Sequence, residues 1–276
     1  MPARTWLVTG CSTGFGRALA ELLLVRGERV VVTARKPEVL DAFVAPHRER
    51  ALALRLDVTR AEEVAAAVDA ARQRFGRIDV LVNNAGSGQV GTVEDTPIEA
   101  ARAALETNFL GALATIKAVL PGMLERRSGQ IVNIGSVAGR IGFPALGYYC
   151  ASKAALGGLS ESLAAELAPL GITVTLAELG PFATDFTRSM GIVPPSAHYD
   201  LAALGQEAGN SGWGAGDDPR AGAEALLAAL DGPAPPRRLI LGEPGLDVVA
   251  LHEVRRREEG ERWLGTSRLE RAGSPG

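Results

Sequence analysis

The first 180 residues alternate between short apolar runs and longer segments that mix apolar and charged positions. The apolar runs are continuous rather than alternating, which is typical of strands buried on both faces of a parallel sheet. The segments between them repeat apolar residues with the helical period. Strands are expected at residues 5–9, 28–33, 51–56, 78–82, 130–134 and 172–177, with a further one at 238–241. We therefore predict a doubly wound α/β domain whose parallel sheet carries helices on both faces.

The same pattern places the helices between these strands. They are expected at residues 17–26, 37–44, 60–75, 97–126, 148–167 and 218–230. Gly76 directly follows one of them and is a typical helix stop. Pro97 suits the first turn of the longest helix. Pro121 lies inside that helix, where a proline removes a hydrogen bond, so we expect a local break there.

The pattern changes after Gly180. Residues 181–218 contain a Pro-Pro pair, several glycines and no clear period. This segment is too long for a loop that only connects two elements, so we interpret it as a substrate lid. The alternative is a disordered loop. The polar residues 265–276 are expected to form a flexible tail. No linker divides the remainder, so residues 1–264 are predicted to form a single domain.

Composition excludes several classes of function. The chain has 276 residues, 46% hydrophobic and 22% charged, as is ordinary for a soluble globular protein. Its net charge of −3 and lack of a long basic block argue against nucleic-acid binding. Arg255–Arg257 are followed at once by Glu258 and Glu259, which we interpret as a solvated helix face. No apolar run approaches the roughly 18 residues that span a bilayer, and no leader pattern opens the chain. We expect a cytoplasmic protein without a membrane partner.

Cysteine and histidine give no sign of a disulfide or a metal site. Cys11 and Cys150 lack partners at C-x-x-C spacing, so both thiols are expected to be reduced. The three histidines have no mutual spacing suited to metal ligands, and no metal is predicted.

Glycines cluster between the first predicted strand and the first predicted helix. Gly10, Gly14 and Gly16 form the pattern G-x-x-x-G-x-G rather than the commoner G-x-G-x-x-G. Such glycines let the backbone turn tightly and approach a pyrophosphate, which then meets the helix N-terminus. The strand–loop–helix context favours nucleotide binding; the alternative is a purely structural turn.

Tyr149 and Lys153 lie four residues apart in a predicted helix, so both project from one face, with Cβ atoms roughly 6 Å apart. A free tyrosine has a pKa of about 10 and is a poor base at neutral pH. A nearby ammonium favours the phenolate, and one close charge pair supplies about the 4 kcal/mol that a pKa near 7 requires. Ser136 follows the strand at 130–134, where its hydroxyl could bind a substrate oxygen. The alternative is a surface tyrosine that packs on the lysine stem.

Taken together, these motifs resemble those of the short-chain dehydrogenases/reductases. The resemblance covers residues 5–185 and is specific because the motifs occur in the family's order and at its spacing. It implies a Rossmann-type sheet and an NAD(P)-dependent oxidoreductase. The segments that carry it are TGCSTGFG at 9–16, Asp57-Val58, NNAG at 83–86, Asn108, Ser136 and Tyr149-x-x-x-Lys153.

The resemblance implies a catalytic role for Asn108, Ser136, Tyr149 and Lys153. Asn108 would hold a proton-relay water on a backbone carbonyl, and Ser136 would orient the substrate carbonyl. Tyr149 would be the general acid/base. Lys153 would lower the pKa of that tyrosine and bond the nicotinamide ribose.

The resemblance also implies a cofactor surface. Asp57 and Val58 are similar to the family's adenine-pocket pair, and Asn83 is similar to the start of the turn beside the cofactor. Leu179 departs from the family, which usually has a proline there, and a fixed φ at the lid hinge is lost. The implied cofactor-binding residues are Gly10, Ser12, Thr13, Gly14, Phe15, Gly16, Arg35, Asp57, Val58, Asn84, Ala85, Gly86, Tyr149, Lys153, Gly180 and Thr184.

The end of the second predicted strand bears on the choice of cofactor. NAD-preferring members carry an acidic residue there that bonds the ribose 2′-hydroxyl, but this chain has Ala34. Arg35 follows, and a guanidinium matches a 2′-phosphate in charge and geometry; Lys36 adds a second charge. The family's usual basic residue in the glycine loop is replaced by Thr13. We expect NADP(H) to be preferred, with NAD(H) possible; the alternative is that Arg35 stacks on adenine, as in some NAD-using relatives.

These inferences predict hydride transfer between a nicotinamide and the carbonyl or secondary-alcohol carbon of a small molecule. The apolar residues of the predicted lid are Phe182, Phe186, Met190, Ile192 and Val193. They suggest a hydrophobic substrate, although core packing would explain some of them equally well. The alternatives are a non-catalytic nucleotide-binding sensor or scaffold, and a lyase or epimerase on the same fold. Helices 97–126 and 148–167 are apolar on more than one face, which predicts a homodimer or homotetramer.

Overall fold

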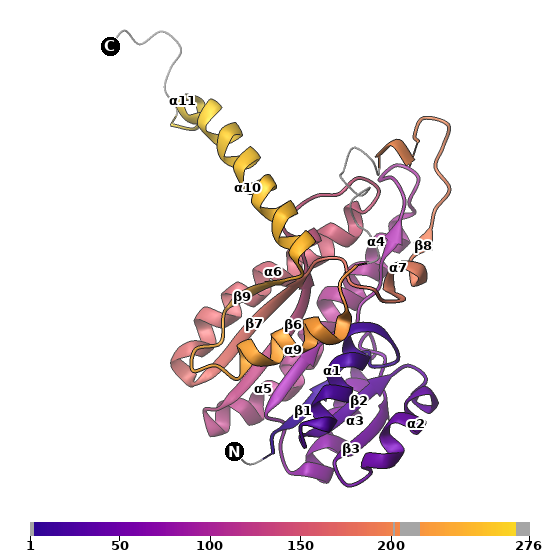
Figure 1. Ribbon diagram of the computed structural model, residues 1–276, viewed down its shortest axis with the longest axis vertical. Helices are drawn as coiled ribbons and strands as arrows, with labels where there is room; N and C mark the ends of the chain where they lie inside the picture. The colour runs from indigo at the N-terminus through magenta and orange to yellow at the C-terminus, as the bar shows by residue number, and fades with distance from the viewer. Residues whose placement is uncertain (1–2, 201, 205–215, 269–276) are drawn as a thin grey trace.

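A sheet of seven parallel strands forms the centre of the molecule, and helices cover both of its faces (Figure 1). The computed structural model describes residues 3–200, 202–204 and 216–268. The strand order is β3-β2-β1-β4-β6-β7-β9, so the predicted doubly wound sheet is confirmed. The strands are β1 (Thr5–Val8), β2 (Arg29–Ala34), β3 (Ala51–Arg55), β4 (Val80–Asn83), β6 (Gly129–Ser136), β7 (Ile172–Leu179) and β9 (Arg238–Leu241).

Each face of the sheet buries its own apolar cluster. Leu7 and Val8 are adjacent in β1, yet Leu7 packs into one cluster and Val8 into the other, and both are fully buried. Burial of one such side chain contributes about 1.5–3 kcal/mol. Helices α1 (Gly14–Val25) and α9 (Pro219–Leu230) cover one face; α3 (Ala61–Phe75), α5 (Gly111–Arg126) and α6 (Gly147–Leu167) cover the other. Short helical pieces are α2 (Asp41–Val44) and 3₁₀ turns at Pro37–Leu40, Ala45–His47, Val137–Gly139 and Ala168–Leu170.

The long predicted helix is interrupted, but not at the proline. It consists of α4 (Ile98–Leu105), a π-helical turn at Glu106–Leu110 and then α5. The predicted break at Pro121 is wrong, because α5 continues through this residue. Pro121 and Lys117 are both exposed, so water can satisfy the Lys117 carbonyl that loses its helical partner. The π turn adds one residue to the helix, a distortion that is frequent at functional sites.

The helical stretch Ile98–Arg126 also bears on the membrane question. Within the described ranges it is the one helix whose length and composition would allow it to cross a membrane. The expectation that no segment would qualify is therefore wrong. The core helix of a soluble protein passes the same test, and 39% of the apolar window is buried here. Ile116 and Met123 of this stretch are almost fully buried in the core.

The described part of the predicted lid has regular structure. Its β8 (Gly191–Ile192) pairs in parallel with β5 (Gln89–Val90), a strand that the sequence pattern did not indicate. It also contains α7 (Phe186–Ser189), and the Ser196 amide donates to the Asp95 carboxylate at 3.0 Å. The lid is thus attached to the segment that follows β4. Lid residues 201 and 205–215 lie outside the described residues.

The C-terminal region contains a helix that was not predicted. α10 (Glu243–Arg262) starts after β9 and projects from the body, followed by α11 (Leu264–Ser267) (Figure 1). The predicted tail is therefore wrong at its start, since residues 265–267 are helical; residues 269–276 lie outside the described ranges. Two glycines and a dense run of charges conceal the helical period of α10.

Candidate active site

The predicted catalytic residues meet at the carboxyl ends of the central strands. Ser136 is the last residue of β6, and Asn108 lies in the π turn between α4 and α5. Tyr149 and Lys153 come from successive turns of α6. A Cβ placed on Gly86 would lie 3.3 Å from Asn108 Oδ1 and 3.7 Å from Lys153 Nζ, so the turn after β4 closes against both.

Asn108 is fixed by hydrogen bonds on both ends of its amide. Its Oδ1 accepts from the Ser87 amide and its Nδ2 donates to the Ser87 carbonyl, each at 2.8 Å. Nδ2 also donates to Ser152 Oγ at 2.9 Å, and Ser152 Oγ donates to the Tyr149 carbonyl at 2.8 Å. Ser152 is fully buried and was not predicted. The sequence feature that could have identified Ser152 was its hydroxyl in the predicted helix, directly before Lys153.

Lys153 is buried with its charge pointing toward the sheet. Its Nζ donates to the Ile134 carbonyl at 2.8 Å and lies 5.9 Å from the centroid of the Tyr149 ring. Burial lowers the pKa of Lys153 to about 8, because a charged ammonium is poorly solvated there. The predicted one-turn spacing of the two side chains is therefore found, with the lysine also held by the strand that ends in Ser136.

The pKa of Tyr149 moves in the direction opposite to the prediction. Burial raises this pKa to about 12, whereas the hydrogen bond with the Ser136 side chain acts to lower it and Cys150 adds a small increase. The expected lowering of this pKa is therefore wrong for the protein alone, because desolvation of the phenolate outweighs the hydrogen bond with Ser136. Ser136 Oγ also accepts from the Ala138 amide at 3.1 Å, which fixes the hydroxyl at the end of β6.

The glycine loop packs directly on the turn after β4. Gly10 has φ +71°, and a Cβ there would lie 2.8 Å from Ala85 Cα. A Cβ on Gly16 would lie 2.2 Å from Asn84 Nδ2, which donates to the Gly10 carbonyl at 2.9 Å. The Ala85 amide donates to Thr9 Oγ1 at 2.9 Å. Gly10 and Gly16 are therefore required by this packing, in addition to any role toward a ligand.

The loop fits the pyrophosphate of a dinucleotide. Thr13 is the N-cap of α1, but no side chain caps this helix and its first turn contains no acidic residue. Ser12 and Thr13 are exposed, and Gly14 has φ +65°. A Cβ on Gly14 would lie 3.4 Å from Thr184 Cβ, so Thr184 faces the loop. Free helical N–H groups without a competing carboxylate form a favourable anion site.

Three other predicted cofactor residues are held by packing. Phe15 is 5% exposed and contacts Phe182 edge to face, with ring centroids 5.6 Å apart. Val58 is buried, and a Cβ on Gly111 would lie 2.5 Å from its Cγ2. Gly180 donates its amide to the Leu241 carbonyl at 2.8 Å, and a Cβ on it would lie 3.0 Å from Gly245. The side chains of Phe15 and Val58 are thus used by the core, and the lid hinge is fixed by α10 although its usual proline is missing.

The residues expected to contact the adenine end of the cofactor lie close together. Arg35 is exposed at the end of β2, directly after the buried Ala34. Burial acts to raise the pKa of Asp57, but hydrogen bonds from Thr59 and the charges of Arg35 and Arg60 together lower it below its usual value. Arg35 is therefore close enough to Asp57 to interact electrostatically, and no carboxylate occupies the Ala34 position.

The apolar residues of the lid divide between two roles. Phe186 lies over the catalytic residue, with its ring centroid 5.7 Å from that of Tyr149. Phe182 packs into the core instead, whereas Ile192 is 72% exposed. Met190 fills the space beside Gly88, where a Cβ would lie 2.7 Å from Met190 Cε. The core-packing alternative therefore holds for Phe182, whereas the hydrophobic substrate stays a prediction.

Comparisons with known proteins agree with this geometry. A family model described as short chain dehydrogenase matches residues 4–192. "Oxidoreductase BOA17" from Botryotinia fuckeliana is 36% identical over 264 residues, which cover 94% of this chain and 96% of that protein. The solved structure of a short-chain dehydrogenase from Streptomyces avermitilis has a TM-score of 0.87 at 40% identity, covering 98% of this chain and 99% of that one. A short chain dehydrogenase from Burkholderia cenocepacia, solved in complex with NADP, has a TM-score of 0.75 at 31% identity, covering 95% and 98%.

Proposed function

The chain belongs to the short-chain dehydrogenase family, and on this premise we propose that it is an NADP(H)-preferring oxidoreductase. It transfers a hydride between the nicotinamide and the carbonyl or secondary-alcohol carbon of a hydrophobic small molecule. One observation carries the proposal. Ser136, Tyr149 and Lys153 converge at the carboxyl end of the sheet, where the glycine loop also presents an uncapped helix N-terminus.

Tyr149 is the proton donor in the reduction of a carbonyl. Burial raises its pKa to about 12, so at neutral pH the phenol keeps its proton, which is the form that reduction requires. The Ser136 hydroxyl interacts with Tyr149 and is placed to hydrogen-bond the same substrate oxygen. When bound, the nicotinamide supplies the hydride. In the reverse reaction, oxidation of an alcohol, Tyr149 would accept the proton that it donates during reduction.

The glycine loop and the residue that follows β2 account for cofactor binding. The backbone of Ser12, Thr13 and Gly14 would hold the pyrophosphate, and Arg35 would hold the 2′-phosphate of NADP. Lys153 would bond the nicotinamide ribose. The NADP bound to the Burkholderia cenocepacia relative supports this choice.

The surroundings of Tyr149 support an apolar substrate. Tyr149 belongs to a cluster of apolar side chains that includes Phe143, Leu146 and Phe186. A substrate whose carbonyl reaches Tyr149 would contact these side chains, and apolar groups gain most from such burial.

The proposal is tested by following NADPH absorbance with a panel of apolar ketones, and in parallel with NADH. We expect consumption of NADPH in step with formation of the alcohol, and weaker activity with NADH. A sensor or scaffold would bind the nucleotide without turnover. A lyase or epimerase would change the substrate without net consumption of NADPH, and either outcome would reject the proposal.

A further inference from the structure

Ala145 has a backbone conformation that alanine rarely adopts. Its φ is +61°, and among the described residues Arg127 is the one other non-glycine residue with a positive φ. Arg127 is the C-cap of α5, where the left-handed conformation is common. Ala145 precedes a helix instead, since α6 begins at Gly147. For residues other than glycine this conformation is disfavoured by about 5–30-fold, and it persists only where the surroundings enforce it.

The strained residue lies in a turn that leads directly into α6. The Leu146 amide donates to the Phe143 carbonyl at 3.1 Å, with a proline and Ala145 between them. A proline followed by a residue of positive φ is the pattern of a type II turn, which favours glycine at the second of these positions. Leu146 is the N-cap of α6, and the Phe143 amide donates to Cys150 Sγ at 3.4 Å. The turn therefore contacts the first turn of α6, which contains Tyr149.

The contact that holds this turn comes from the segment that pairs with the lid. The Gly91 amide donates to the Ala145 carbonyl at 2.8 Å. Gly91 is buried and directly follows β5. A Cβ on Gly91 would lie 2.4 Å from Thr96 Oγ1 and 3.0 Å from Val193 Cβ. Because Val193 belongs to the lid, Gly91 contacts the lid on one side and Ala145 on the other.

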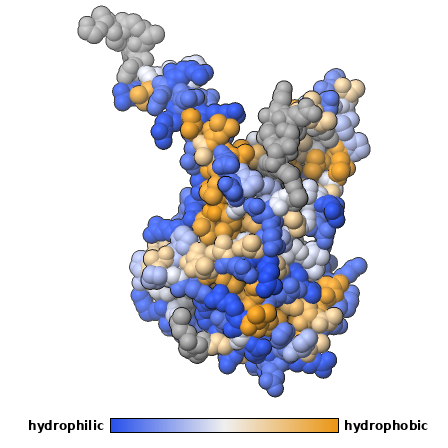
Figure 2. Space-filling model, in the orientation of Figure 1, coloured by the Kyte–Doolittle hydropathy of each residue, from blue (hydrophilic) through white to orange (hydrophobic). Residues whose placement is uncertain are grey.

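At β8 the lid is attached through its backbone. β5 and β8 have two residues each, and the Val193 amide adds a hydrogen bond to the Val90 carbonyl at 2.8 Å. Both residues of β8 are exposed, Ile192 by 72%, so its side chains bury little apolar surface. The lid lies at the upper right of Figure 1, and Figure 2 shows apolar residues on the surface there. Loss of the Val193 hydrogen bond should therefore release β8 from β5 and Gly91.

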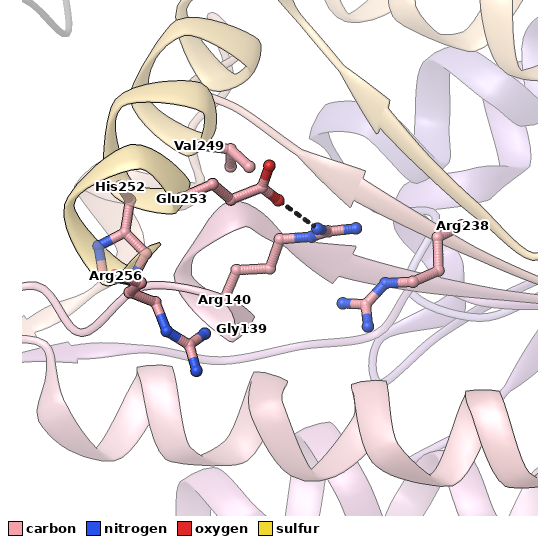
Figure 3. Close-up of a pocket in the computed structure, with 7 residues that line it drawn as sticks. All are labelled: Gly139, Arg140, Arg238, Val249, His252, Glu253 and Arg256. Atoms are coloured by element: carbon pink, nitrogen blue, oxygen red, sulfur yellow. Dashed lines mark hydrogen bonds and ion pairs between the residues drawn. The ribbon is translucent and has the colours of Figure 1, made fainter. Parts of the chain in front are cut away.

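The loop before the turn is not closely packed on its α10 side. A cavity of about 220 Å³ lies between the base of α10 and the residues Gly139 and Arg140 (Figure 3). Arg140 Nη1 donates to the Glu253 carboxylate at 3.2 Å across this space. This ion pair supports the start of the loop but does not reach the turn, whereas the Gly91 hydrogen bond is made to Ala145 itself.

We propose that Ala145 is a positioning residue whose strained turn couples the lid to Tyr149. While β8 is paired with β5, Gly91 holds Ala145 at a positive φ and keeps the first turn of α6 in place. When this pairing is lost, Ala145 relaxes to a negative φ and the turn shifts against α6. Tyr149 is thus aligned for proton transfer only while the lid is attached. The inference rests on the proposed role of Tyr149.

The test releases β8 in the full-length protein and follows two quantities. Val193→Pro removes the amide that donates to Val90. The first quantity is kcat with NADPH and an accepted ketone. The second is the rate at which iodoacetamide alkylates Cys150 without cofactor, measured by mass spectrometry of the peptide that contains it. Cys150 monitors the turn because it is 7% exposed and accepts from the Phe143 amide. Alkylation requires no turnover, so an inactive parent protein would reject the proposed function and still leave the coupling measurable.

Glycine at the strained position makes the test specific. Val193→Pro should lower kcat by about 5–30-fold, the preference of alanine for the relaxed turn, and should speed alkylation of Cys150, with KM for NADPH unchanged. Adding Ala145→Gly should restore both quantities, because glycine adopts a positive φ without strain. A lid that is merely damaged would not be rescued by this change. Val193→Ala keeps the amide and is the matched control, which should be alkylated at the parent rate.

Ala145→Val examines the same turn with the lid intact, in case Val193→Pro does not fold. A β-branched residue is still less compatible with a positive φ, so this variant should speed alkylation and lower kcat. Cys150 alkylation that is unchanged in Ala145→Val or in folded Val193→Pro would overturn the proposal. So would a Val193→Pro protein that Ala145→Gly fails to rescue.

Discussion

At the scale of single residues, we propose that Arg35 decides which nicotinamide is used. It is exposed beside a position that lacks a carboxylate, and an Arg–phosphate contact contributes roughly 1.5–3 kcal/mol. Arg35→Ala should lower kcat/KM for NADPH by about 10–150-fold and change the value for NADH little. Arg29→Ala, an exposed arginine at the other end of β2, is the matched control and should change neither. Equal losses of kcat/KM with both cofactors, or a wild type that prefers NADH, would show that Arg35 does not bind the 2′-phosphate.

Lys153 should give the stability of the protein a specific dependence on pH. Below pH 8 it is protonated in both the folded and unfolded states. Between about 8 and its usual pKa of 10.5, the folded state has released the proton and the unfolded state has kept it, so the free energy of unfolding rises with pH. The rise is about 3 kcal/mol for this group, at 1.36 kcal/mol per pKa unit.

Comparison with Lys153→Met isolates this contribution, because the variant lacks the titrating group and Tyr149 titrates in both proteins. Urea unfolding of the cofactor-free proteins across the window should show wild type gaining stability relative to the variant as pH rises. If the difference in unfolding free energy between the two proteins stayed constant from pH 7.5 to 10.5, burial would not lower the pKa of Lys153.

The sequence predicted which candidate site residues would lie together, but it did not predict their energetics. Type and spacing are local, so Tyr149, Lys153 and Ser136 were recognisable before any fold was known. The direction of the Tyr149 pKa depends on how completely the phenol is desolvated, and that is set by side chains such as Phe186 from a distant segment. The partner of Asn108 was missed for the same reason, since Ser152 is 44 residues away.

At the scale of elements, Glu178 joins the catalytic end of the sheet to the base of α10. Its side chain is 1% exposed and accepts from Arg140 at 2.9 Å and from Arg238 at 2.5 Å. Arg140 continues to Glu253 on α10, and Arg238 pairs with Glu161 on α6. A buried carboxylate is stable here only because two guanidinium groups satisfy it.

Glu178→Ala should therefore destabilise the protein by about 3 kcal/mol, the lower end of the cost of breaking a buried pair, since both arginines can still reach water. Glu161→Ala removes the outer carboxylate of the same network, which is 55% exposed, and should cost under about 1 kcal/mol. Urea denaturation of the two variants measures both values. Similar small losses of stability in the two variants would show that Glu178 is not the central residue of this network.

Elements were predictable where local pattern and tertiary context agree. The strands of the sheet are buried on both faces, so their continuous apolar runs were clear. The break predicted at Pro121 is wrong because an exposed proline can be accommodated within a helix. The π turn at Glu106–Leu110 was not predicted because it depends on packing. β5 and β8 have two residues each and exist only through their pairing, for which a single segment gives no signal.

At the scale of the whole molecule, α4, the π turn at Glu106–Leu110 and α5 leave large apolar side chains in solvent. The large ones are Ile98 at 54% exposure, Leu105 at 37%, Leu110 at 42% and Leu124 at 37%. We propose that these side chains are covered in a homodimer or homotetramer, because a helix that is apolar on more than one face must bury the second face elsewhere.

Leu105→Glu would place a charge in that interface and should lower the molar mass measured by light scattering at micromolar concentration. Val25→Glu is the matched control, since Val25 is 72% exposed on α1, a helix of the other face, and should leave the mass unchanged. A monomeric wild type would contradict the expected assembly, as would a Leu105→Glu variant with the wild-type mass.

Two adjacent tyrosines allow a direct measurement of whether Tyr149 transfers the proton during hydride transfer from NADPH. Tyr148 is the matched control, because its hydroxyl donates to the Val93 carbonyl at 3.1 Å instead of interacting with Ser136. Reduction rates are measured for Tyr149→Phe and Tyr148→Phe with NADPH and an accepted ketone, together with NADPH binding. We predict that Tyr149→Phe binds NADPH normally but is slower by about 10²–10⁴-fold, whereas Tyr148→Phe keeps most of the wild-type rate. A Tyr149→Phe enzyme that retained more than half of the wild-type rate would contradict it.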